Sequence, residues 1–367
     1  MTRPLDQRPL TSTPGRRPDR RSRPAADGAH SRPAPPARRT DLMTSRILVT
    51  GGAGFIGSAY VRALLGPSGP PGVTVTVLDK LTYAGSLARL EPVRTHPRYA
   101  FVHGDVCDAP TVRRLAAGHD EIVHFAAESH VDRSIEDGSG FTLTNVVGTQ
   151  VLLDAALRHG VRTFVQISTD EVYGSLPEGA AREEDPLRPS SPYAASKAAA
   201  DLIALAHHRT HGLDVRVTRC TNNFGPYQHP EKVIPRFVAT LLTGGNLPMY
   251  GDGRQVRDWL HVDDHVRAVE LVRTTGRPGE VYNIGGGTAL TNLELAGRLL
   301  DWCGAGPDRI EHVADRKGHD RRYAVDDGKI TTELGYRPRT AFTPALTATA
   351  DWYRTHRDWW EPLFTAR

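Results

Sequence analysis

Cysteine is scarce in this chain of 367 residues, and long apolar runs are missing. Cys107, Cys220 and Cys303 lie far apart without a C-x-x-C pair, which argues against a disulfide framework or a structural zinc site and favours a reducing cytoplasm. No run approaches the ~20 apolar residues that a membrane-spanning helix needs. We therefore expect a cytoplasmic protein without membrane association, long enough to bury a large core in two lobes.

A surplus of positive charge is confined to residues 1–42, which hold ten Arg, four Asp and eight Pro. The rest of the chain has no surplus positive charge for nucleic acid. Residues 1–42 have few bulky apolar side chains to offset the entropy of ordering, and they lack the apolar segment of a secretory signal. We predict a disordered Arg/Pro-rich extension, with a nucleic-acid-binding arm as the alternative. Met43, directly before the first strand, is an alternative start.

From Ser45 onward, short β-rich runs alternate with helical stretches. Apolar strands separated by helices are typical of a parallel sheet covered on both faces. We expect strands at 46–51, 73–79, 99–105, 121–127, 163–169 and 214–220, and helices at 54–65, 145–160, 291–303 and 343–357. This pattern predicts an α/β fold: a Rossmann-type doubly wound parallel sheet with a smaller C-terminal substrate-binding lobe. Ligands of such sheets lie at the carboxyl ends of the strands.

A glycine-rich turn joins the first predicted strand to the first predicted helix. "TGGAGFIGS" places Gly51, Gly54 and Gly57 in a G-x-x-G-x-x-G pattern. Glycines at these positions permit a tight turn and let a dinucleotide pyrophosphate approach the helix N-terminus. Asp79 ends the next strand, where a carboxylate accepts from the adenosine ribose and repels a 2′-phosphate, so it favours NAD over NADP; Lys80 beside it acts against that preference.

The pattern loosens after residue 225, where Gly, Pro and polar residues become frequent. We therefore predict an NAD-binding Rossmann domain over 43–225 with a later contribution from about 254–284. Residues 226–253 and 285–367 are predicted to form the substrate-binding lobe.

A tyrosine and a lysine stand four residues apart in "SSPYAASKAAADL". Ser191 and Pro192 are typical of a helix start, which places Tyr193 and Lys197 on one helix face. An ammonium near a phenol favours the phenolate. We therefore predict that Lys197 lowers the pKa of Tyr193, so that Tyr193 can take the proton of a substrate alcohol.

With its glycine turn and its Tyr/Lys pair, the chain resembles the extended short-chain dehydrogenase/reductase superfamily. The resemblance is closest to the dTDP-glucose 4,6-dehydratases, through "LDKLTYAGS", "HFAAESHVDRSI", "STDEVYG", "TRCTNNFGPYQHPEKVIPRF", "RDWLHVDDH" and "DRKGHDRRYAVD". It implies a homodimeric NAD-dependent hydro-lyase that converts dTDP-glucose to dTDP-4-keto-6-deoxyglucose. "GGGTALTN" and "DRKGHDRRY" resemble actinobacterial members that supply deoxysugars for secondary metabolites such as antibiotics.

The resemblance also assigns roles to the residues after the strand that ends at Thr169. Thr169 hydrogen-bonds the reacting oxygen, Glu171 takes the C5 proton once C4 is a ketone, and Asp170 protonates the departing C6 hydroxyl. Hydride then returns to C6. Because Asp170 must be protonated to act, we expect burial and the neighbouring carboxylate to raise its pKa.

Two larger sets of residues follow from the resemblance. The implied NAD site consists of Gly51, Gly54, Phe55, Ile56, Gly57, Asp79, Lys80, Leu81, Thr82, Asp105, Val106, Ala126, Ala127, Ser129, Thr144, Tyr193, Lys197 and Asn223. The implied substrate site consists of Ser129, Thr169, Asn222, Lys232, Val233, Pro248, Met249, Tyr250, Arg257, Asn292, Asp315 and His319.

Several alternatives stay open. The base could be thymine or uracil, and the scaffold also suits a UDP-sugar 4-epimerase, a UDP-glucuronate decarboxylase or a catalytically silent NAD-binding protein. The adjacent Asp170 and Glu171 argue against epimerisation, and the intact Thr169, Tyr193 and Lys197 argue against a silent protein. In "HVDDH", His261 and His265 stand four apart, but we interpret this segment as an Asp-capped helix start and predict no metal.

Overall fold

A computed structural model describes residues 44–365 of the chain. The predicted disordered extension over 1–42 lies outside the described residues. The largest sheet has seven strands, and every neighbouring pair is parallel. In spatial order the strands are β3 (Tyr99–His103), β2 (Val73–Asp79), β1 (Ser45–Thr50), β4 (Glu121–His124), β5 (Thr163–Thr169), β6 (Val215–Cys220) and β10 (Val281–Ile284). The strand order reverses between β1 and β4, which is where such sheets bind ligands.

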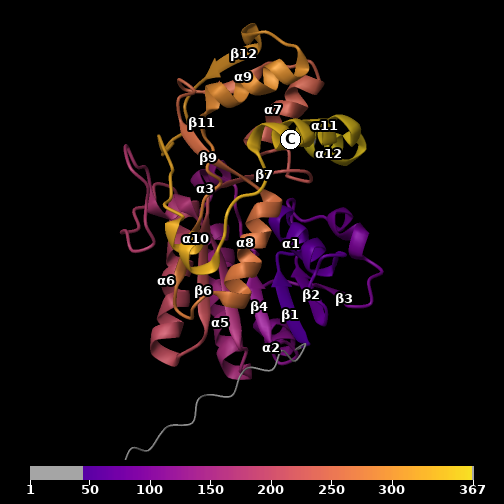
Figure 1. Cartoon of the computed structure of the whole chain (residues 1–367), viewed down its shortest axis with the longest axis vertical. Helices are drawn as coiled ribbons and strands as arrows, with labels where there is room; N and C mark the ends of the chain where they lie inside the picture. The colour runs from indigo at the N-terminus through magenta and orange to yellow at the C-terminus, as the bar shows by residue number, and fades with distance from the viewer. Residues whose placement is uncertain (1–43, 366–367) are drawn as a thin grey trace, which may run out of the picture. The chain divides into compact units, whose positions relative to one another are not determined.

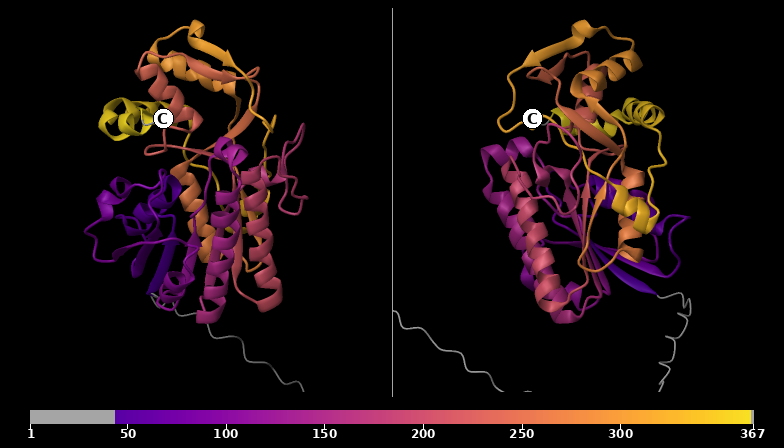
Figure 2. Two further views of the ribbon diagram at one scale, coloured as in Figure 1. Left: turned by 180° about the vertical axis from the view of Figure 1, so that it is seen from behind. Right: turned by 60° about the vertical axis from the view of Figure 1, so that its left-hand side comes forward.

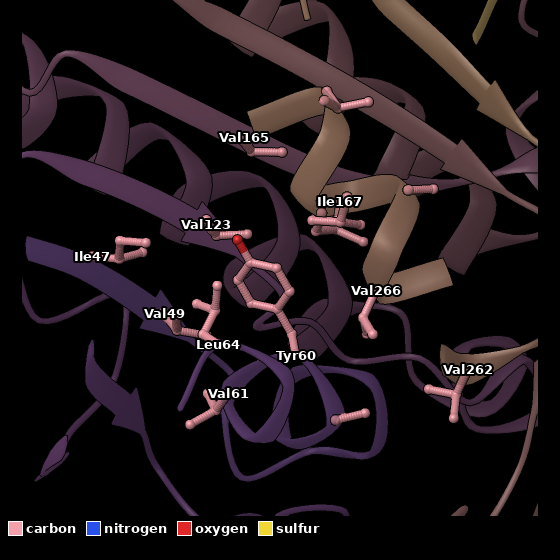
Figure 3. Close-up of a cluster of buried hydrophobic side chains, with 14 of the residues drawn as sticks. Ile47, Val49, Tyr60, Val61, Leu64, Val123, Val165, Ile167, Val262 and Val266 are labelled. Atoms are coloured by element: carbon pink, nitrogen blue, oxygen red, sulfur yellow. The ribbon is translucent and has the colours of Figure 1, made fainter. Parts of the chain in front are cut away.

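Helices cover both faces of this sheet, as the right-hand view of Figure 2 shows. One face packs against α1 (Phe55–Leu65), α8 (Val262–Thr275) and α10 (Gly328–Leu334); the other packs against α2 (Ala109–Ala116), α5 (Gly148–His159) and α6 (Pro192–His211). Figure 3 shows Tyr60 of α1 and Val266 of α8 beside Val123 and Val165 of the sheet. The predicted doubly wound α/β fold is therefore confirmed.

The remaining elements lie beyond the carboxyl ends of the large sheet (Figure 1). Two small sheets consist of β7 (Asn222–Phe224), β9 (Val256–His261) and β11 (Ala289–Thr291), and of β8 (Leu247–Tyr250) and β12 (Ile310–Val313). The helices α7 (Val233–Leu242), α9 (Asn292–Cys303), α11 (Phe342–Thr355) and α12 (Arg357–Thr365) share a second apolar core with them. The predicted domain bounds stay a prediction.

Short helical segments complete the described chain. They are η1 (Leu87–Val93), α3 (Val131–Glu136), α4 (Ser139–Phe141), the π-helical η2 (Thr142–Val147), η3 (Asp170–Tyr173) and η4 (Pro307–Arg309). Two predicted strands are too long, since β3 ends at His103 and β4 at His124. Beyond β3 the chain turns at Asp105, whose carboxylate accepts from the Cys107 N–H at 2.9 Å. No helix among residues 44–365 has the length and apolarity to cross a membrane.

The "HVDDH" segment begins α8, but the predicted Asp cap is wrong. His261 is the capping residue, and its ring Nδ1 accepts from the Asp263 N–H at 3.3 Å. His265 is fully buried, and neither of its ring nitrogens has a hydrogen-bond partner among the described residues. Within residues 44–365, no group of three or more His, Cys, Asp or Glu side chains could hold a metal ion.

Burial lowers the pKa of His265 to about 3, so acid should destabilise the fold through this residue. The unfolded chain takes up a proton near pH 6.5 and the folded chain only near pH 3, so the free energy of unfolding falls as the pH drops between these values. His265→Leu should reduce that slope by one proton, or about 1.4 kcal/mol per pH unit. Urea titrations at several pH values measure it. The exposed His159→Leu is the control, and an unchanged slope in His265→Leu would contradict the assignment.

Candidate active site

The glycine turn forms a cradle at the end of β1. Gly51 has φ +69°, and a Cβ built on it would lie 2.5 Å from the Ala126 nitrogen. A Cβ on Gly57 would lie 2.3 Å from the Gly51 carbonyl oxygen. These positions therefore require glycine so that the backbone can pass close to β4 and open the first turn of α1 toward a ligand.

Gly57→Ala should abolish tight cofactor binding, because the new methyl group would push the turn away from α1. The measurement is the NAD content of the purified protein together with its melting temperature. Gly297→Ala in α9 is the matched control, because nothing lies within 4 Å of its built Cβ and alanine favours a helix by roughly 0.5–1 kcal/mol. Full NAD content in Gly57→Ala would refute the cradle.

Asp79 braces this turn from β2. Its carboxylate accepts from the Ala53 N–H at 2.9 Å and from the Leu81 N–H at 2.8 Å. Lys80 beside it points its ammonium to Asp105 instead, at 3.3 Å. Because Lys80 is paired in this way, it does not offset the charge of Asp79, and the predicted preference for a cofactor without a 2′-phosphate keeps its physical basis.

A first cavity opens along the carboxyl ends of the strands, from the glycine turn to the Asp170–Glu171 pair. Every residue of the predicted NAD site lines it except Leu81. Leu81 has φ +52° and packs against the core beneath the cavity. Thr169, Asp170, Glu171, Asn222 and Lys232 line the same cavity.

The helix that carries Tyr193 and Lys197 begins as predicted. The Ser191 hydroxyl caps it by accepting from the Ala194 N–H at 3.1 Å, and Pro192 is the first helical residue. Both Tyr193 and Lys197 line the first cavity beside Thr169, the last residue of β5. The Thr169 side chain acts to lower the pKa of the Tyr193 phenol.

The prediction that Tyr193 has a lowered pKa is wrong for the chain's own side chains. Burial raises the pKa of the phenol well above its usual range, and the charges of Glu171, Cys220 and Asp170 raise it further. Lys197 is itself buried, which lowers its pKa, and its Nζ donates to the Ile167 carbonyl at 2.6 Å. The ammonium is thus tied to the main chain of β5.

Asp170 and Glu171 begin η3, directly after β5. The Thr169 hydroxyl oxygen caps this short helix by accepting from the Glu171 N–H at 3.3 Å, and it donates to Asp170 Oδ1 at 3.2 Å. Gly174, at φ +76°, follows the helix. Thr169, at the end of β5, therefore holds the two carboxyl groups at the carboxyl ends of the strands.

The two carboxyl groups have different surroundings. Burial raises the pKa of Asp170 well above its usual range, as predicted, and the Glu171 carboxylate adds to the effect. Burial also raises the pKa of Glu171, but the charges of Arg257, Arg316 and Lys232 act in the opposite direction. Neighbouring carboxyls with separated pKa values are suited to act as an acid and a base, with the proton on Asp170.

A second cavity adjoins the first, and Ser129, Glu171, Asn222, Glu231 and Lys232 line both. The second cavity contains these predicted substrate residues: Ser129, Asn222, Lys232, Val233, Pro248, Met249, Tyr250, Arg257, Asn292 and His319. Thr169 lines only the first cavity. Asp315 lines neither and lies behind His319, whose Nδ1 contacts its carboxylate at 2.6 Å.

Sequence reasoning missed several charged or polar residues of the second cavity, and three of them bear on its chemistry. Arg236, Arg316 and Tyr323 line it, and Arg316 pairs with Asp132 at 3.4 Å. Arg257 stacks on the Tyr323 ring, with its guanidinium carbon 4.2 Å from the ring centre. "DRKGHDRRY" contained the signal, because its two ends place a cation and an aromatic ring close to His319.

The residues present fit a dinucleotide cofactor in the first cavity. The glycine cradle would admit its pyrophosphate, and Asp79 stands where an adenosine ribose would lie. Thr221 Oγ1, Asn222 Oδ1 and Asn223 Oδ1 are buried polar atoms without a partner among the described residues, and all three residues line this cavity. Such atoms are available to a polar ligand.

A family model described as GDP-mannose 4,6 dehydratase matches residues 48–349. The chain belongs to this family. It is 64% identical over 324 residues to a dTDP-glucose 4,6-dehydratase of Streptomyces griseus, covering 88% of this chain and 98% of that protein. A dTDP-glucose 4,6-dehydratase of Streptomyces niveus is 61% identical over 320 residues, covering 87% and 95%.

A solved structure of the dTDP-glucose 4,6-dehydratase DesIV from Streptomyces venezuelae, with NAD bound, superposes with a TM-score of 0.86 at 61% identity. The match covers 87% of this chain and 99% of that one. The resemblance to this dehydratase family, predicted from the motifs, is therefore confirmed.

Proposed function

We propose that the chain is an NAD-dependent dTDP-glucose 4,6-dehydratase, a hydro-lyase that forms dTDP-4-keto-6-deoxyglucose. The observation that carries the proposal is the place of Asp170 and Glu171. Both line the first cavity beside Tyr193, and Glu171 also faces the second cavity. An epimerase or a silent NAD-binding protein has no use for an adjacent acid and base at this point.

The family resemblance implies the roles, and the positions of these side chains in the first cavity support them. Tyr193 takes the C4 hydroxyl proton while Thr169 hydrogen-bonds the same oxygen. NAD⁺, when bound, would supply the hydride acceptor and would be restored when hydride returns to C6; its positively charged ring would favour the Tyr193 phenolate. Glu171 then removes the C5 proton, and protonated Asp170 gives its proton to the departing C6 hydroxyl, so that water leaves across C5–C6. When hydride returns to C6, the proton held by Glu171 returns to C5.

Cations of the second cavity suit the diphosphate of a nucleotide sugar. Lys232, Arg236, Arg257 and Arg316 line it together with His319. Arginine binds phosphate oxygens through paired N–H donors, and lysine binds them as a point charge. We assign the diphosphate to this cluster, which places the hexose between it and the Asp170–Glu171 pair.

The test is incubation with dTDP-glucose and UDP-glucose in separate reactions, with the 4-keto product followed by its absorbance in alkali and by mass. Loss of one water from dTDP-glucose supports the proposal. An isomer of unchanged mass would indicate an epimerase, and loss of carbon dioxide from a UDP-glucuronate control would indicate a decarboxylase. Preferential turnover of UDP-glucose would reassign the base.

We also propose that the enzyme is a cytoplasmic homodimer that supplies deoxysugars, including those of antibiotics. Large apolar side chains are exposed on adjoining helices of one face: Leu143 and Val147 on η2, Leu157 on α5 and Leu202 on α6. A second copy would cover them. All three cysteines are free thiols, which suits a reducing compartment. Light scattering of the wild type and of Leu202→Glu tests the dimer.

A further inference from the structure

Arg89, in η1, is a buried cation that has no role in the catalytic steps proposed above. Only 1% of its surface is exposed. Its guanidinium donates to three main-chain carbonyls, at Ala53 (3.1 Å), Ala84 (2.6 Å) and Tyr227 (3.0 Å). Arg89 also lines the first cavity. One side chain therefore joins three loops that are far apart in the sequence.

Each of the three loops contributes to the lining of the first cavity, and the two that contain Ala53 and Ala84 lie against Asp79. Ala53 belongs to the glycine turn, and its N–H donates to the Asp79 carboxylate. Ala84 lies in the loop after β2 and lines the cavity, while Tyr227 directly precedes Gln228 and His229, which line it from the loop after β7. Arg89 thus fixes the main chain around the position expected for the adenosine ribose.

The C-terminal helices α11 and α12 also contact Arg89 and the loop of Tyr227. Its guanidinium lies 5.2 Å from the ring centre of Trp359 in α12, a cation–π contact. Trp359 also packs edge-on against Tyr227, and Trp352 of α11 packs on the same Tyr227 ring with the centres 4.6 Å apart. In Figures 1 and 2, α11 and α12 lie over the part of the chain that contains α1.

Burying a guanidinium has a cost that simple loop packing would avoid. Burial lowers the pKa of Arg89 to about 10, while the interactions with Tyr353 and, to a smaller extent, Asp79 act against that effect. The Asp79 carboxylate is thus one of the groups that offset the burial of this cation.

We propose that Arg89 is a positioning residue for the cofactor: it locks the three loops around the adenosine end of the first cavity, and α12 holds it there through Trp359. The C-terminal helix thereby sets how tightly NAD is retained. This inference rests on the proposed function, because it takes the first cavity to be the NAD site.

The experiment measures release of NADH from the full-length protein by fluorescence, together with dTDP affinity and melting temperature. Arg89→Leu should accelerate release about tenfold or more, because bonds from a charged donor are lost, and dTDP affinity should stay within about twofold. Arg89→Lys should recover part of the retention. Arg94→Leu, an exposed arginine directly after η1, is the matched control and should change neither quantity.

The C-terminal contact is tested in the same assay. Trp359→Leu should also accelerate release, whereas Trp302→Leu, which loses apolar packing in the second core, should lower only the melting temperature. Both substitutions disrupt the same contact between Arg89 and Trp359. The double variant, Arg89→Leu with Trp359→Leu, should therefore release NADH about as fast as Arg89→Leu alone.

The inference would be overturned if folded Arg89→Leu released NADH at the wild-type rate. It would also be overturned if the accelerations caused by Arg89→Leu and Trp359→Leu multiplied in the double variant. If Arg89→Leu does not fold, Arg89→Lys and Trp359→Leu decide by the same readout. A wild type that binds no NADH would instead overturn the proposed function, so the two failures are distinguishable.

Discussion

Glu171→Gln should leave the first oxidation intact and stop the elimination, so that reduced cofactor accumulates on the enzyme when dTDP-glucose is added. The amide retains the shape of the side chain but cannot take the C5 proton. A positioned base typically contributes ~10²–10⁴-fold, and we expect dehydration to slow by that factor. Stopped-flow absorbance follows the reduced cofactor, and the alkaline 4-keto assay follows the product.

Glu178→Gln is the control, because this glutamate is exposed in the loop that follows η3. It should dehydrate dTDP-glucose at the normal rate. If Glu171→Gln also kept near-normal turnover, Glu171 would not be the base, and the raised pKa of the pair would need another explanation.

Tyr193→Phe should give the opposite pattern: no reduced cofactor at any time and no product. Without the phenolic hydroxyl, the chain loses the group that we propose receives the C4 proton. The loss should again be ~10²–10⁴-fold or larger, but it falls on the first step. Tyr99→Phe, on β3, is the control and should retain activity.

The pair of variants separates the two halves of the reaction on one enzyme. Reduced cofactor that appears in Glu171→Gln and not in Tyr193→Phe places the tyrosine before the glutamate. Reduced cofactor formed normally by Tyr193→Phe would remove Tyr193 from the oxidation step and transfer its role to another group of the first cavity.

Local patterns in the sequence were sufficient for much of this site. Ser191 and Pro192 predicted the start of α6, and the apolar run of β5 predicted that Asp170 and Glu171 would lie at the sheet edge. Both inferences hold because capping and strand burial depend on residues close in sequence.

The errors arose where contacts between distant segments decide. Burial raises the pKa of the Tyr193 phenol, and the charge of Glu171, more than twenty positions earlier, raises it further. Leu81, with φ +52°, packs against the core and does not line the first cavity, so its place in the NAD site stays a prediction. Arg316 lines the second cavity and forms an ion pair there with Asp132, which is remote in the sequence. Contacts between residues so far apart in the sequence cannot be predicted from a local sequence pattern.

The large sheet receives its last strand late in the chain. β6 ends at Cys220, and its outer neighbour β10 begins only at Val281, after β7, α7, β8, β9 and α8. When only β1 to β6 have emerged from the ribosome, β6 is therefore an unpaired edge strand. Unpaired edge strands are sites at which nascent chains aggregate. Any fragment cut before β10 should share that hazard, so we expect a separate nucleotide-binding half to aggregate more readily than the whole chain.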